Sequence, residues 1–513
     1  MLGRREGPGV QRVALTEARS GVGELLRLAD SLNSELESRR GRTERSGRGQ
    51  FATPSQAAQT MASLVEPAGG VLSVVDPGAG AGALMLALVA AAVDRGRLER
   101  LSVVLVETDT QALELLDAAC RAALLVADAH GLRLETRVVA SDFCDVSGWA
   151  DGRSFDAVIL NPPYMKLGAS DPCRLMVGRR HGVDCPNLYA AFLAVAVELL
   201  RDGGQLVAIT PRSFANGLYF TNFRRHLTDR ASFRHVILFD RRDRVFRSSS
   251  VLQETVIFSM RKSASGPGDL VRVETRPDHI SGPQEVHDVP HHNIVLPHDP
   301  GRFINLPGSP DVMCVAERVA ALPADLRSLG LSVSTGPVVD FRCREHLTAA
   351  RVEGSVPLIY PVNLRDARVE WPLEARKPQG FTVAPQTRRW LFPNGIYVLV
   401  KRFTAKEERR RVVACVYDPV DGYGHVAFEN HVNVIHRDHG PLRRPEAESL
   451  VNFLNSDLVD TYFRMFSGST QVNATDLRRL RLPELCESHR STFFDAENSC
   501  LPDHGIGNCE PLS

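Results

Sequence analysis

The sequence predicts an α/β protein, in which a doubly wound, mostly parallel sheet is followed by a mixed, mostly β domain. Three observations support this prediction. Between residues 51 and 260, apolar runs alternate with helical patterns, which is the order of a parallel sheet covered by helices on both faces. Between residues 330 and 440 the apolar runs are shorter and turns separate them, as in β domains. The chain has 513 residues, which is too many for one hydrophobic core.

Seven apolar runs are the expected strands of the first sheet. Helical patterns at 82–94, 109–128 and 187–201 lie between several of them. The last two runs have only a loop between them, which favours an antiparallel pair at that end of the sheet. The expected strands are residues 71–76, 101–107, 134–142, 155–160, 204–210, 235–240 and 253–260.

Changes of composition divide the chain into segments. The segment before the sheet combines an amphipathic helix, at about 13–38, with a basic Arg/Gly/Ser stretch. The segment after the sheet is rich in Gly, Pro, His and Asp, so we expect an irregular linker. A helix at 446–466 is expected to pack on the β domain, and the final tail is expected to be poorly ordered. The segments are 1–48 (helix and basic linker), 49–262 (sheet domain), 263–334 (linker), 335–486 (β domain) and 487–513 (tail).

Composition limits the class of protein. Acidic and basic residues balance at 61 each, so a site for a polyanion has to come from local clusters of Lys and Arg. The ten cysteines are scattered without a CxxC pair, which argues against a metal site or a disulfide framework and favours a reducing cytoplasm. No apolar run approaches the ~18 residues of a membrane span, and the N-terminus lacks the apolar core of a signal peptide. We therefore expect a cytoplasmic protein with no metal and no membrane partner, acting as a monomer.

The first expected strand ends in an acidic residue and a glycine-rich turn, "VVDPGAGAGALML" at 74–86. Asp76 is followed by Gly78, Gly80 and Gly82, which allow a tight turn and a close approach of the backbone to a ligand, as in nucleotide-binding sheets. The spacing is not the dinucleotide GxGxxG pattern. A purely structural turn is the alternative interpretation.

The next two expected strands also end in polar residues. The second strand ends in Glu107, whose carboxylate can accept from both hydroxyls of a ribose at the strand tip. The alternative is a helix N-cap cluster with Asp109 or Thr110. Asp142 and Phe143 follow the third strand, either to accept from an adenine amine and cover a ring or as ordinary loop and core residues. Because ligands of open α/β sheets bind at these strand ends, three such ends in succession favour a ligand site.

The fourth expected strand runs into Asn161-Pro162-Pro163-Tyr164, within "FDAVILNPPYMKLG" at 155–168. The prolines end the strand because each lacks an N–H and fixes its φ. They also hold the backbone so that the Asn161 side-chain oxygen and the Pro162 carbonyl can accept both hydrogens of an –NH2 group and localise its lone pair. Tyr164 offers a face on which a planar base can stack.

In their order and number, these motifs resemble those of the gamma-class, TaqI-type DNA adenine-N6 methyltransferases of restriction–modification systems, which use S-adenosylmethionine. "GQFATPSQAAQTMASLV" at 49–65 is similar to the first cofactor-contacting segment of that family, with Thr53 at the matching place. Residues 186–211 are similar to the helix–strand unit after the catalytic loop, and residues 238–258 to the motif that holds the flipped base. The resemblance is dense over 49–260 and looser in the β domain, where it implies target recognition.

The resemblance implies a cofactor, a partner and a set of residue roles. The partner would be double-stranded DNA, and a separately encoded restriction endonuclease is a compatible further partner. Methyl transfer would depend on positioning and lone-pair localisation rather than on a strong base. S-adenosylmethionine would be bound by Thr53, Asp76, Gly78, Gly80, Gly82, Glu107, Asp142 and Phe143. The flipped adenine would be held by Asn161, Pro162, Pro163 and Tyr164 and by the aromatic ring of Phe246.

Two basic stretches of the β domain are candidate phosphate contacts. "KRFTAKEERRR" at 401–411 carries six Lys or Arg against two Glu, and "EARKPQGFTVAPQTRRW" at 374–390 adds further positive charge. The alternative is a solvated surface. The candidate DNA-binding residues are Lys401, Arg402, Arg409, Arg410, Arg388 and Arg389.

Other kinds of protein share parts of this pattern. The release-factor glutamine methyltransferases, which modify protein, resemble this chain only over the sheet and would not need a second domain of this size. An RNA base amino-methyltransferase is a further alternative. A non-catalytic DNA-binding subunit of a defence complex would keep the fold, yet the intact NPPY loop beside Glu107 and Asp142 argues against it. The favoured function is therefore methyl transfer into DNA.

Overall fold

The computed structural model describes residues 21–39, 51–150, 152–215, 217–239, 255–266, 268–278, 282–295, 301–306, 315, 318–374, 377–404, 408–466 and 471–485. The chain divides into two compact units, Met1–Cys314 with Met465–Ser469, and Val315–Arg464 with Thr470–Ser513. No helix within the described ranges combines the length and the apolar character needed to cross a membrane.

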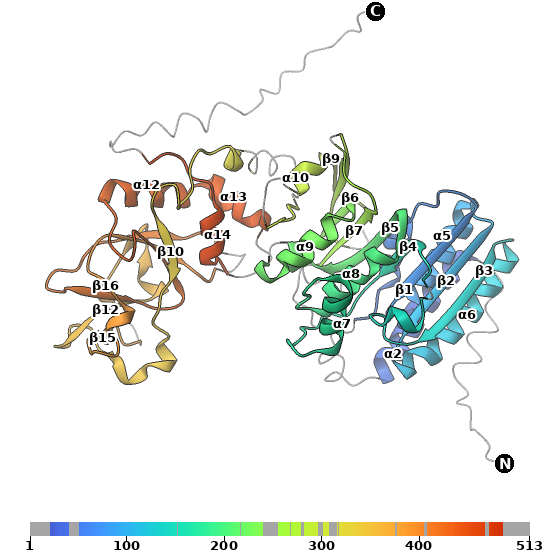
Figure 1. Ribbon diagram of the computed structural model, residues 1–513, viewed down its shortest axis with the longest axis horizontal. Helices are drawn as coiled ribbons and strands as arrows, with labels where there is room; N and C mark the ends of the chain where they lie inside the picture. The colour runs from blue at the N-terminus through green and yellow to red at the C-terminus, as the bar shows by residue number, and fades with distance from the viewer. Residues whose placement is uncertain are drawn as a thin grey trace, which may run out of the picture. The chain divides into compact units, whose positions relative to one another are not determined.

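The first unit is built on a nine-stranded sheet with the order β3-β2-β1-β4-β5-β7-β6-β8-β9 (Figure 1). The first five strands are parallel, and β7 runs antiparallel between β5 and β6. All seven predicted strands are confirmed, as is the antiparallel pair. The strands are β1 (Val71–Pro77), β2 (Arg100–Glu107), β3 (Arg133–Ala140), β4 (Phe155–Leu160), β5 (Leu200–Pro211), β6 (Ser232–Phe239), β7 (Thr255–Arg261), β8 (Leu270–Arg276) and β9 (Glu285–Pro290).

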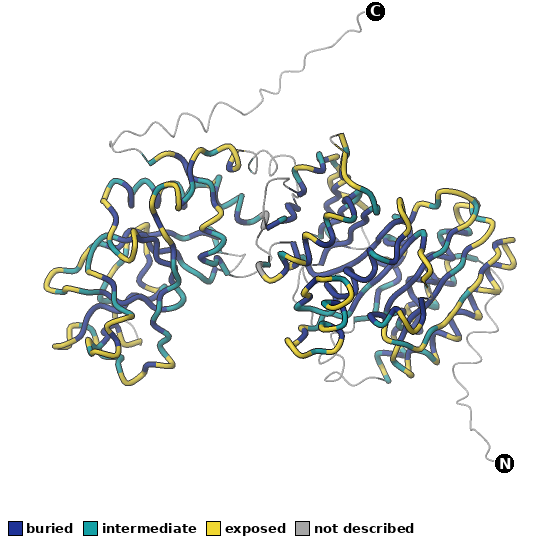
Figure 2. Tube along the Cα trace, in the orientation of Figure 1, coloured by how far each residue is buried: buried dark blue, intermediate teal, exposed yellow. Residues whose placement is uncertain are grey.

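A hydrophobic core lies on each face of this sheet. Successive residues of β1 and β4 alternate between the cores, with Val74 and Ile159 in one and Val75 and Val158 in the other, as pleated strands require. The strands are consequently buried along most of their length (Figure 2). The first core is covered by α2 (Val22–Arg39), α4 (Ser55–Ser63), α5 (Ala83–Arg95) and α6 (Thr110–Ala129), and the second by α7 (Pro172–His181), α8 (Leu188–Leu199) and α9 (Thr221–Thr228).

The N-terminal helix α2 belongs to the sheet unit rather than to a separate segment. Leu25, Ala29, Leu32 and Leu36 recur at the spacing of one helical face and are buried in the first core. The predicted helix is therefore confirmed over Val22–Arg39, and its apolar face has a partner. The basic stretch at 40–50 lies outside the described residues.

The interpretation of 263–334 as an irregular linker is wrong between residues 270 and 294. Strands β8 and β9 extend the sheet, and a short helix, α10 (His291–Ile294), follows. Val271 and Val273 are buried in the second core, but the alternating face carries Arg272 and Glu274. Because one face of these strands is polar, the sequence lacks the continuous apolar run that marks the inner strands.

The second unit is mostly β, as predicted. Its sheets have the orders β10-β20-β17-β18-β14-β13 and β11-β15-β12-β19-β16, and α12 packs on β17 and β18 in one shared core. The strands are β10 (Ser332–Thr335), β11 (Leu347–Thr348), β12 (Ser355–Ile359), β13 (Leu364–Arg365), β14 (Arg368–Val369), β15 (Gly380–Thr382), β16 (Leu391–Pro393), β17 (Tyr397–Lys401), β18 (Ala414–Tyr417), β19 (His425–Phe428) and β20 (Val432–His436). The helices are α12 (Arg444–Leu454), α13 (Asp457–Phe466) and α14 (Ala474–Arg479).

The single helix predicted at 446–466 is two helices, α12 and α13. Helix α12 ends at its C-cap residue, Asn455, whose side chain bonds the backbone of Ala414 in β18. Asn455 Oδ1 accepts from the Ala414 N–H at 2.9 Å, and its Nδ2 donates to the Ala414 carbonyl at 2.8 Å. The Ser456 hydroxyl then accepts from the N–H of Val459 and begins α13. The break therefore comes from a contact with a strand about 40 residues away, which no local pattern reveals.

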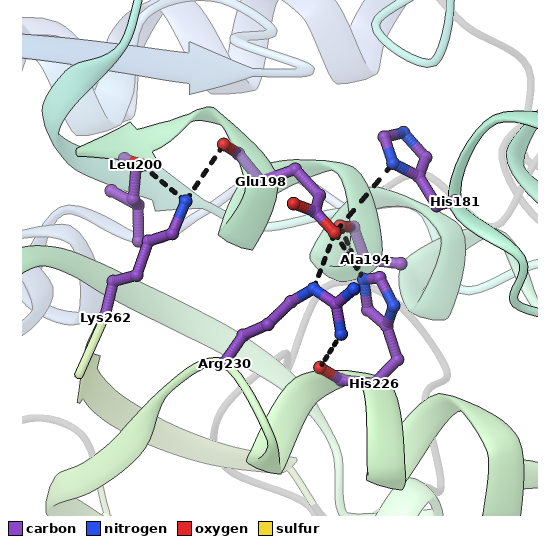
Figure 3. Close-up of polar contacts among 7 residues, drawn as sticks. All are labelled: His181, Ala194, Glu198, Leu200, His226, Arg230 and Lys262. Carbon is purple, nitrogen blue, oxygen red and sulfur yellow. Dashed lines mark hydrogen bonds and ion pairs between the residues drawn. The ribbon is translucent and has the colours of Figure 1, made fainter. Parts of the chain in front are cut away.

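A cluster of polar side chains joins α7, α8 and α9 (Figure 3). The Glu198 carboxylate on α8 accepts from Arg230 Nε at 2.6 Å, and its Oε1 lies 3.4 Å from His226 Nε2 on α9 and 4.0 Å from His181 Nδ1 on α7. Burial and the nearby Arg230 charge lower the pKa of His226, against the opposing influence of Ala194 and Glu198. The imidazole is therefore held mainly neutral at the junction of three helices.

We expect His226→Gln to make stability less sensitive to acid. As pH falls through the ordinary pKa of 6.5, the unfolded chain gains a proton on His226 before the folded protein does, so stability is lost. Glutamine cannot titrate, so the melting temperature of the variant should fall less between pH 7.5 and 5.5 (chosen to bracket that pKa). The measurement is thermal unfolding followed by circular dichroism. His130→Gln, at an exposed position outside the cluster, is the control, and an equal slope in all three proteins would contradict the prediction.

Candidate cofactor pocket and catalytic loop

A pocket opens where the strand order reverses, at the carboxyl ends of β1, β2 and β4. Ligands of open α/β sheets bind at such a switch point. The sequence-predicted residues that line the pocket are Thr53, Gly78, Gly80, Glu107, Asp142, Phe143, Asn161 and Pro163. The structure thus brings together residues from four separate strand ends and from the segment before α4.

The glycine-rich turn has two distinct parts. Gly80 has φ +56°, and a Cβ built on it meets open space on the pocket side, so the backbone can approach a ligand. Gly82, with φ +89°, does not line the pocket. A Cβ on Gly82 would lie 2.9 Å from Leu116 of α6, so this glycine permits close packing of α5 and α6.

The Glu107 carboxylate is held by backbone N–H groups. Oε2 accepts from Gly80 at 2.8 Å, and Oε1 accepts from Thr108 at 2.8 Å and from Asp109 at 2.9 Å. Asp109 in turn caps α6 by accepting from Gln111 and Ala112. Asp109 therefore caps the helix, as one interpretation of this strand end predicts, while the Glu107 carboxylate lines the pocket in a fixed orientation; its role as a ribose ligand stays a prediction.

The third strand end supplies an aromatic wall. Phe143 is buried and its ring lies 5.0 Å from that of Phe192 on α8 and 5.5 Å from that of Trp149, centroid to centroid. Asp142 Oδ1 accepts from the N–H of Cys144 at 2.9 Å, which fixes the turn. Phe192 also lines the pocket, and the sequence analysis missed it because α8 is apolar on all sides.

Asp76 is a fully buried carboxylate at the tip of β1. Among the described residues, no donor reaches either of its oxygens, and it lies behind the pocket wall rather than in it. Burial, with a smaller effect of Glu107, raises its pKa well above the usual value. An uncompensated buried carboxylate is costly, so the electrostatics at this point favour a cationic ligand.

The Asn161 amide is oriented by two acceptors. Its Nδ2 donates to the carbonyl of Phe51 at 3.1 Å and to Thr53 Oγ1 at 3.0 Å. Since a backbone carbonyl can only accept, the nitrogen has to face Phe51, and Oδ1 therefore points the other way. Asn161 Oδ1 receives a hydrogen bond from the Tyr164 hydroxyl at 3.1 Å.

Tyr164 is packed more closely than an open stacking platform would be. Its ring lies 5.6 Å from that of Phe51 and 6.3 Å from that of Tyr189, and its hydroxyl also lies within 3.3 Å of the Ile209 carbonyl. Burial raises the pKa of the Tyr164 hydroxyl, and the nearby Tyr189 raises it further, so the group stays neutral. Pro162 is buried, and Phe246 lies outside the described residues.

Helix α2 adds a wall to the pocket that the sequence analysis did not foresee. Asn33, Leu36 and Glu37 line it. A basic stretch of sequence separates these residues from the motif region, and nothing in their local pattern distinguishes them from an ordinary amphipathic helix.

The six candidate DNA-binding residues of the second unit differ in their surroundings. Arg388, Arg389 and Arg409 are exposed. Lys401 pairs with Glu408 at 2.8 Å, Arg410 pairs with Asp457 at 2.9 Å, and Arg402 donates to the Asn430 carbonyl. Arg411, part of the same basic stretch, is fully buried and bonds Thr404, so it is a structural residue.

Comparison with known proteins identifies the family. The family model of the Eco57I restriction-modification methylase matches residues 107–246. The chain is 37% identical over 469 residues to the type II methyltransferase M.PstI of Providencia stuartii, which covers 89% of this chain and 91% of that protein. The chain belongs to the type II DNA methyltransferases of restriction–modification systems. It is also 36% identical over 452 residues to M.BsuBI of Bacillus subtilis, covering 85% of this chain and 87% of that protein.

Among solved structures, the type IIG restriction endonuclease BpuSI aligns with a TM-score of 0.43 and 15% identity, covering 84% of this chain and 57% of that one.

The methyl donor of a type II DNA methyltransferase is S-adenosylmethionine, and the pocket residues fit this cofactor. Asp76 lies behind the pocket wall and does not line it, but its carboxyl, which has no donor among the described residues, would be favoured in its ionised form by a molecule that carries positive charge on a sulfonium and an ammonium group. The open space beside Gly80 permits close approach, and the aromatic wall of Phe143 and Phe192 suits a planar base. The prediction of this cofactor from the sequence is confirmed by the family.

We expect Asp76→Asn to stabilise the free protein and to weaken its affinity for S-adenosylmethionine. Because the folded-state pKa is raised, the folded protein retains a proton that the unfolded chain loses, and stability falls as pH rises above the ordinary value of 3.8. Asparagine removes this loss, so the melting temperature without cofactor should exceed that of the wild type at pH 8 (well above 3.8).

The same variant should bind S-adenosylmethionine about tenfold less tightly, in line with losing a charged partner. Isothermal titration calorimetry measures the affinity, and Glu66→Gln, outside the pocket lining, is the matched control. An unchanged affinity in Asp76→Asn would contradict the assignment of its charge to the cofactor.

Proposed function

We propose that the protein transfers the methyl group of S-adenosylmethionine to the N6 amine of an adenine within a specific double-stranded DNA sequence. The observation that supports this most directly is the orientation of Asn161, whose amide oxygen is turned away from Phe51 at the edge of the cofactor pocket. A fixed neutral acceptor at that point suits an uncharged –NH2 group. In its cell, the modification would protect DNA from a cognate restriction endonuclease.

The target base has to leave the duplex, because an amine inside the stack cannot reach the pocket. In the proposed mechanism Asn161 Oδ1 and the Pro162 carbonyl accept the two hydrogens of the amine. These bonds concentrate the nitrogen lone pair towards the cofactor methyl group. The cofactor supplies an electrophilic methyl on a good leaving group, so the chain contributes orientation and electrostatic preorganisation.

Tyr164 has two proposed roles, one for its ring and one for its hydroxyl. Its ring supplies a face for the extruded base, which offsets part of the few kcal/mol lost on unstacking. Its neutral hydroxyl occupies Asn161 Oδ1 in the free protein and would be joined or replaced there by the incoming amine. Phe246 is proposed as a second contact to the base, on the resemblance alone.

The second unit is proposed to read the DNA target. The exposed Arg388, Arg389 and Arg409 are the stronger candidates for phosphate contacts, since Lys401 and Arg410 already face carboxylates. Arg389 also lies over the Trp390 ring at 5.1 Å, which holds its guanidinium in place. Salt-dependent binding is expected from such contacts.

We expect Asn161→Ala to reduce kcat by about 100-fold or more, because it removes a positioned acceptor used in the transition state. Cofactor affinity should change much less, since Glu107 and the glycine turn remain. Transfer of tritiated methyl groups to DNA measures the loss, and nucleoside chromatography of wild-type product should give N6-methyladenine. N4-methylcytosine as the product would overturn the choice of base while leaving DNA methylation intact.

Tyr164→Phe and Tyr164→Ala separate the ring from the hydroxyl. Phenylalanine keeps a stacking face and loses only the bond to Asn161, so we expect kcat to fall by less than about tenfold. Alanine removes the face as well, which is worth about 1–3 kcal/mol per stacked base, and kcat should fall by about 100-fold. Equal losses in the two variants would show that the hydroxyl, and not the ring, is what matters.

A further inference from the structure

The N-terminal helix is tied directly to the segment that orients the catalytic amide. Asn33 of α2 donates from Nδ2 to the backbone carbonyl of Thr53 at 2.8 Å. Asn33 is 8% exposed and Thr53 is 7% exposed. Water therefore cannot easily replace this bond. Without the Asn33 side chain, the Thr53 carbonyl would lose the hydrogen-bond donor that Asn33 supplies.

Both acceptors of the Asn161 amide lie within two residues of this carbonyl. They are the Phe51 carbonyl and the Thr53 hydroxyl, which receive Asn161 Nδ2 at 3.1 and 3.0 Å. A shift of residues 51–53 would move both acceptors at once and turn the amide with them. The side chain of Asn33 thus acts on the same residue that carries one of the two acceptors.

Helix α2 is held in place around this contact by apolar packing and by hydrogen bonds. Leu32, the neighbour of Asn33 in sequence, is buried in the core shared with α5 and α6. One turn earlier, the Asp30 carboxylate accepts from the backbone N–H of Ser55 at 3.0 Å and from its hydroxyl at 2.6 Å. The Asp30 bonds hold the start of α4, whereas the Asn33 bond holds the segment that bears the acceptors.

We propose that Asn33 is a positioning residue for methyl transfer, acting through the Thr53 carbonyl on the orientation of the Asn161 amide. The N-terminal helix is then part of the catalytic machinery and not only a cover of the sheet. This inference rests on the proposed role of Asn161 as the acceptor of the target amine. It extends that role to a residue that precedes Thr53 by twenty positions in the sequence.

The test measures steady-state methyl transfer by the full chain at saturating DNA and cofactor. Asn33→Ala should lower kcat by about tenfold or more, because small displacements of a reacting group carry costs of this order. The KM for DNA should stay within about threefold of the wild type, since Asn33 is not one of the residues proposed to contact DNA. Asn33→Asp, of nearly the same size but without the donor at neutral pH, should show the same loss and serves if the alanine variant fails to fold.

Leu32→Ala is the matched control on the same helix. It removes buried apolar surface from α2 and should lower the melting temperature, yet it leaves the bond to Thr53 intact. At a temperature well below its unfolding transition, its kcat should stay within about twofold of the wild type. A loss of kcat equal to that of Asn33→Ala would overturn the proposal, because helix docking alone would then explain the effect.

A double-mutant cycle with Thr53→Val tests the route of the effect. Valine removes one acceptor of the Asn161 amide, so part of what Asn33 positions is already lost. The two losses in kcat should combine to clearly less than their product, whereas fully multiplicative losses would contradict action through Thr53.

An Asn33→Ala enzyme with wild-type kcat would overturn the inference. A wild-type enzyme that methylates a base other than adenine would instead overturn the proposed function, and the Asn33 comparison would still be measurable on that base.

Discussion

The orientation of one amide, that of Asn161, is the constraint on which the arrangement of the site depends. An amide has a donor end and an acceptor end, and a backbone carbonyl can bond only the donor. The Phe51 carbonyl therefore fixes which end of the Asn161 amide is left to face away from residues 51–53. The switch in strand order places this amide at the pocket, because β4 ends beside β1. In the proposed function, the topology of the sheet would thereby bring the acceptor for the amine beside the methyl donor.

The sequence was most informative where a strand is buried on both faces. Such strands read as continuous apolar runs, and each run ended close to the observed strand end. It was misleading at β8 and β9, because their outer face carries Arg272 and Glu274 and breaks the apolar run. It was also misleading at the junction of α12 and α13, where Asn455 bonds a distant strand. Both errors arise where the environment of a residue, and not its local pattern, decides the structure.

The same distinction applies to the site. The positions of Glu107, Asp142 and Asn161 were predictable because each lies at or within two residues of the end of its own strand, and parallel strands end at one edge of the sheet. Asn33 and Phe192 were not predictable, because each lies on a helix whose position is set by packing against other elements. Gly82 carried the right pattern for a cofactor turn, yet its neighbour is Leu116. A glycine needed for packing and a glycine needed for a ligand look alike in sequence.

The charges of the site are distributed in a way that suits the chemistry. The Asp76 carboxyl is fully buried, and among the described residues no donor reaches it, so burial raises its pKa and favours the protonated form. A cationic cofactor in the pocket would favour the ionised form, so the expected interaction would couple cofactor binding to the charge of this group. Around Asn161, burial likewise keeps the Tyr164 hydroxyl neutral by raising its pKa. Asp76, before the glycine turn, and Tyr164, beside Asn161, are thus both shifted by burial towards their neutral forms in the free protein. In the proposed function, only Asp76 of these two would ionise, in response to a cationic cofactor, while the groups that would meet an uncharged amine stay neutral dipoles.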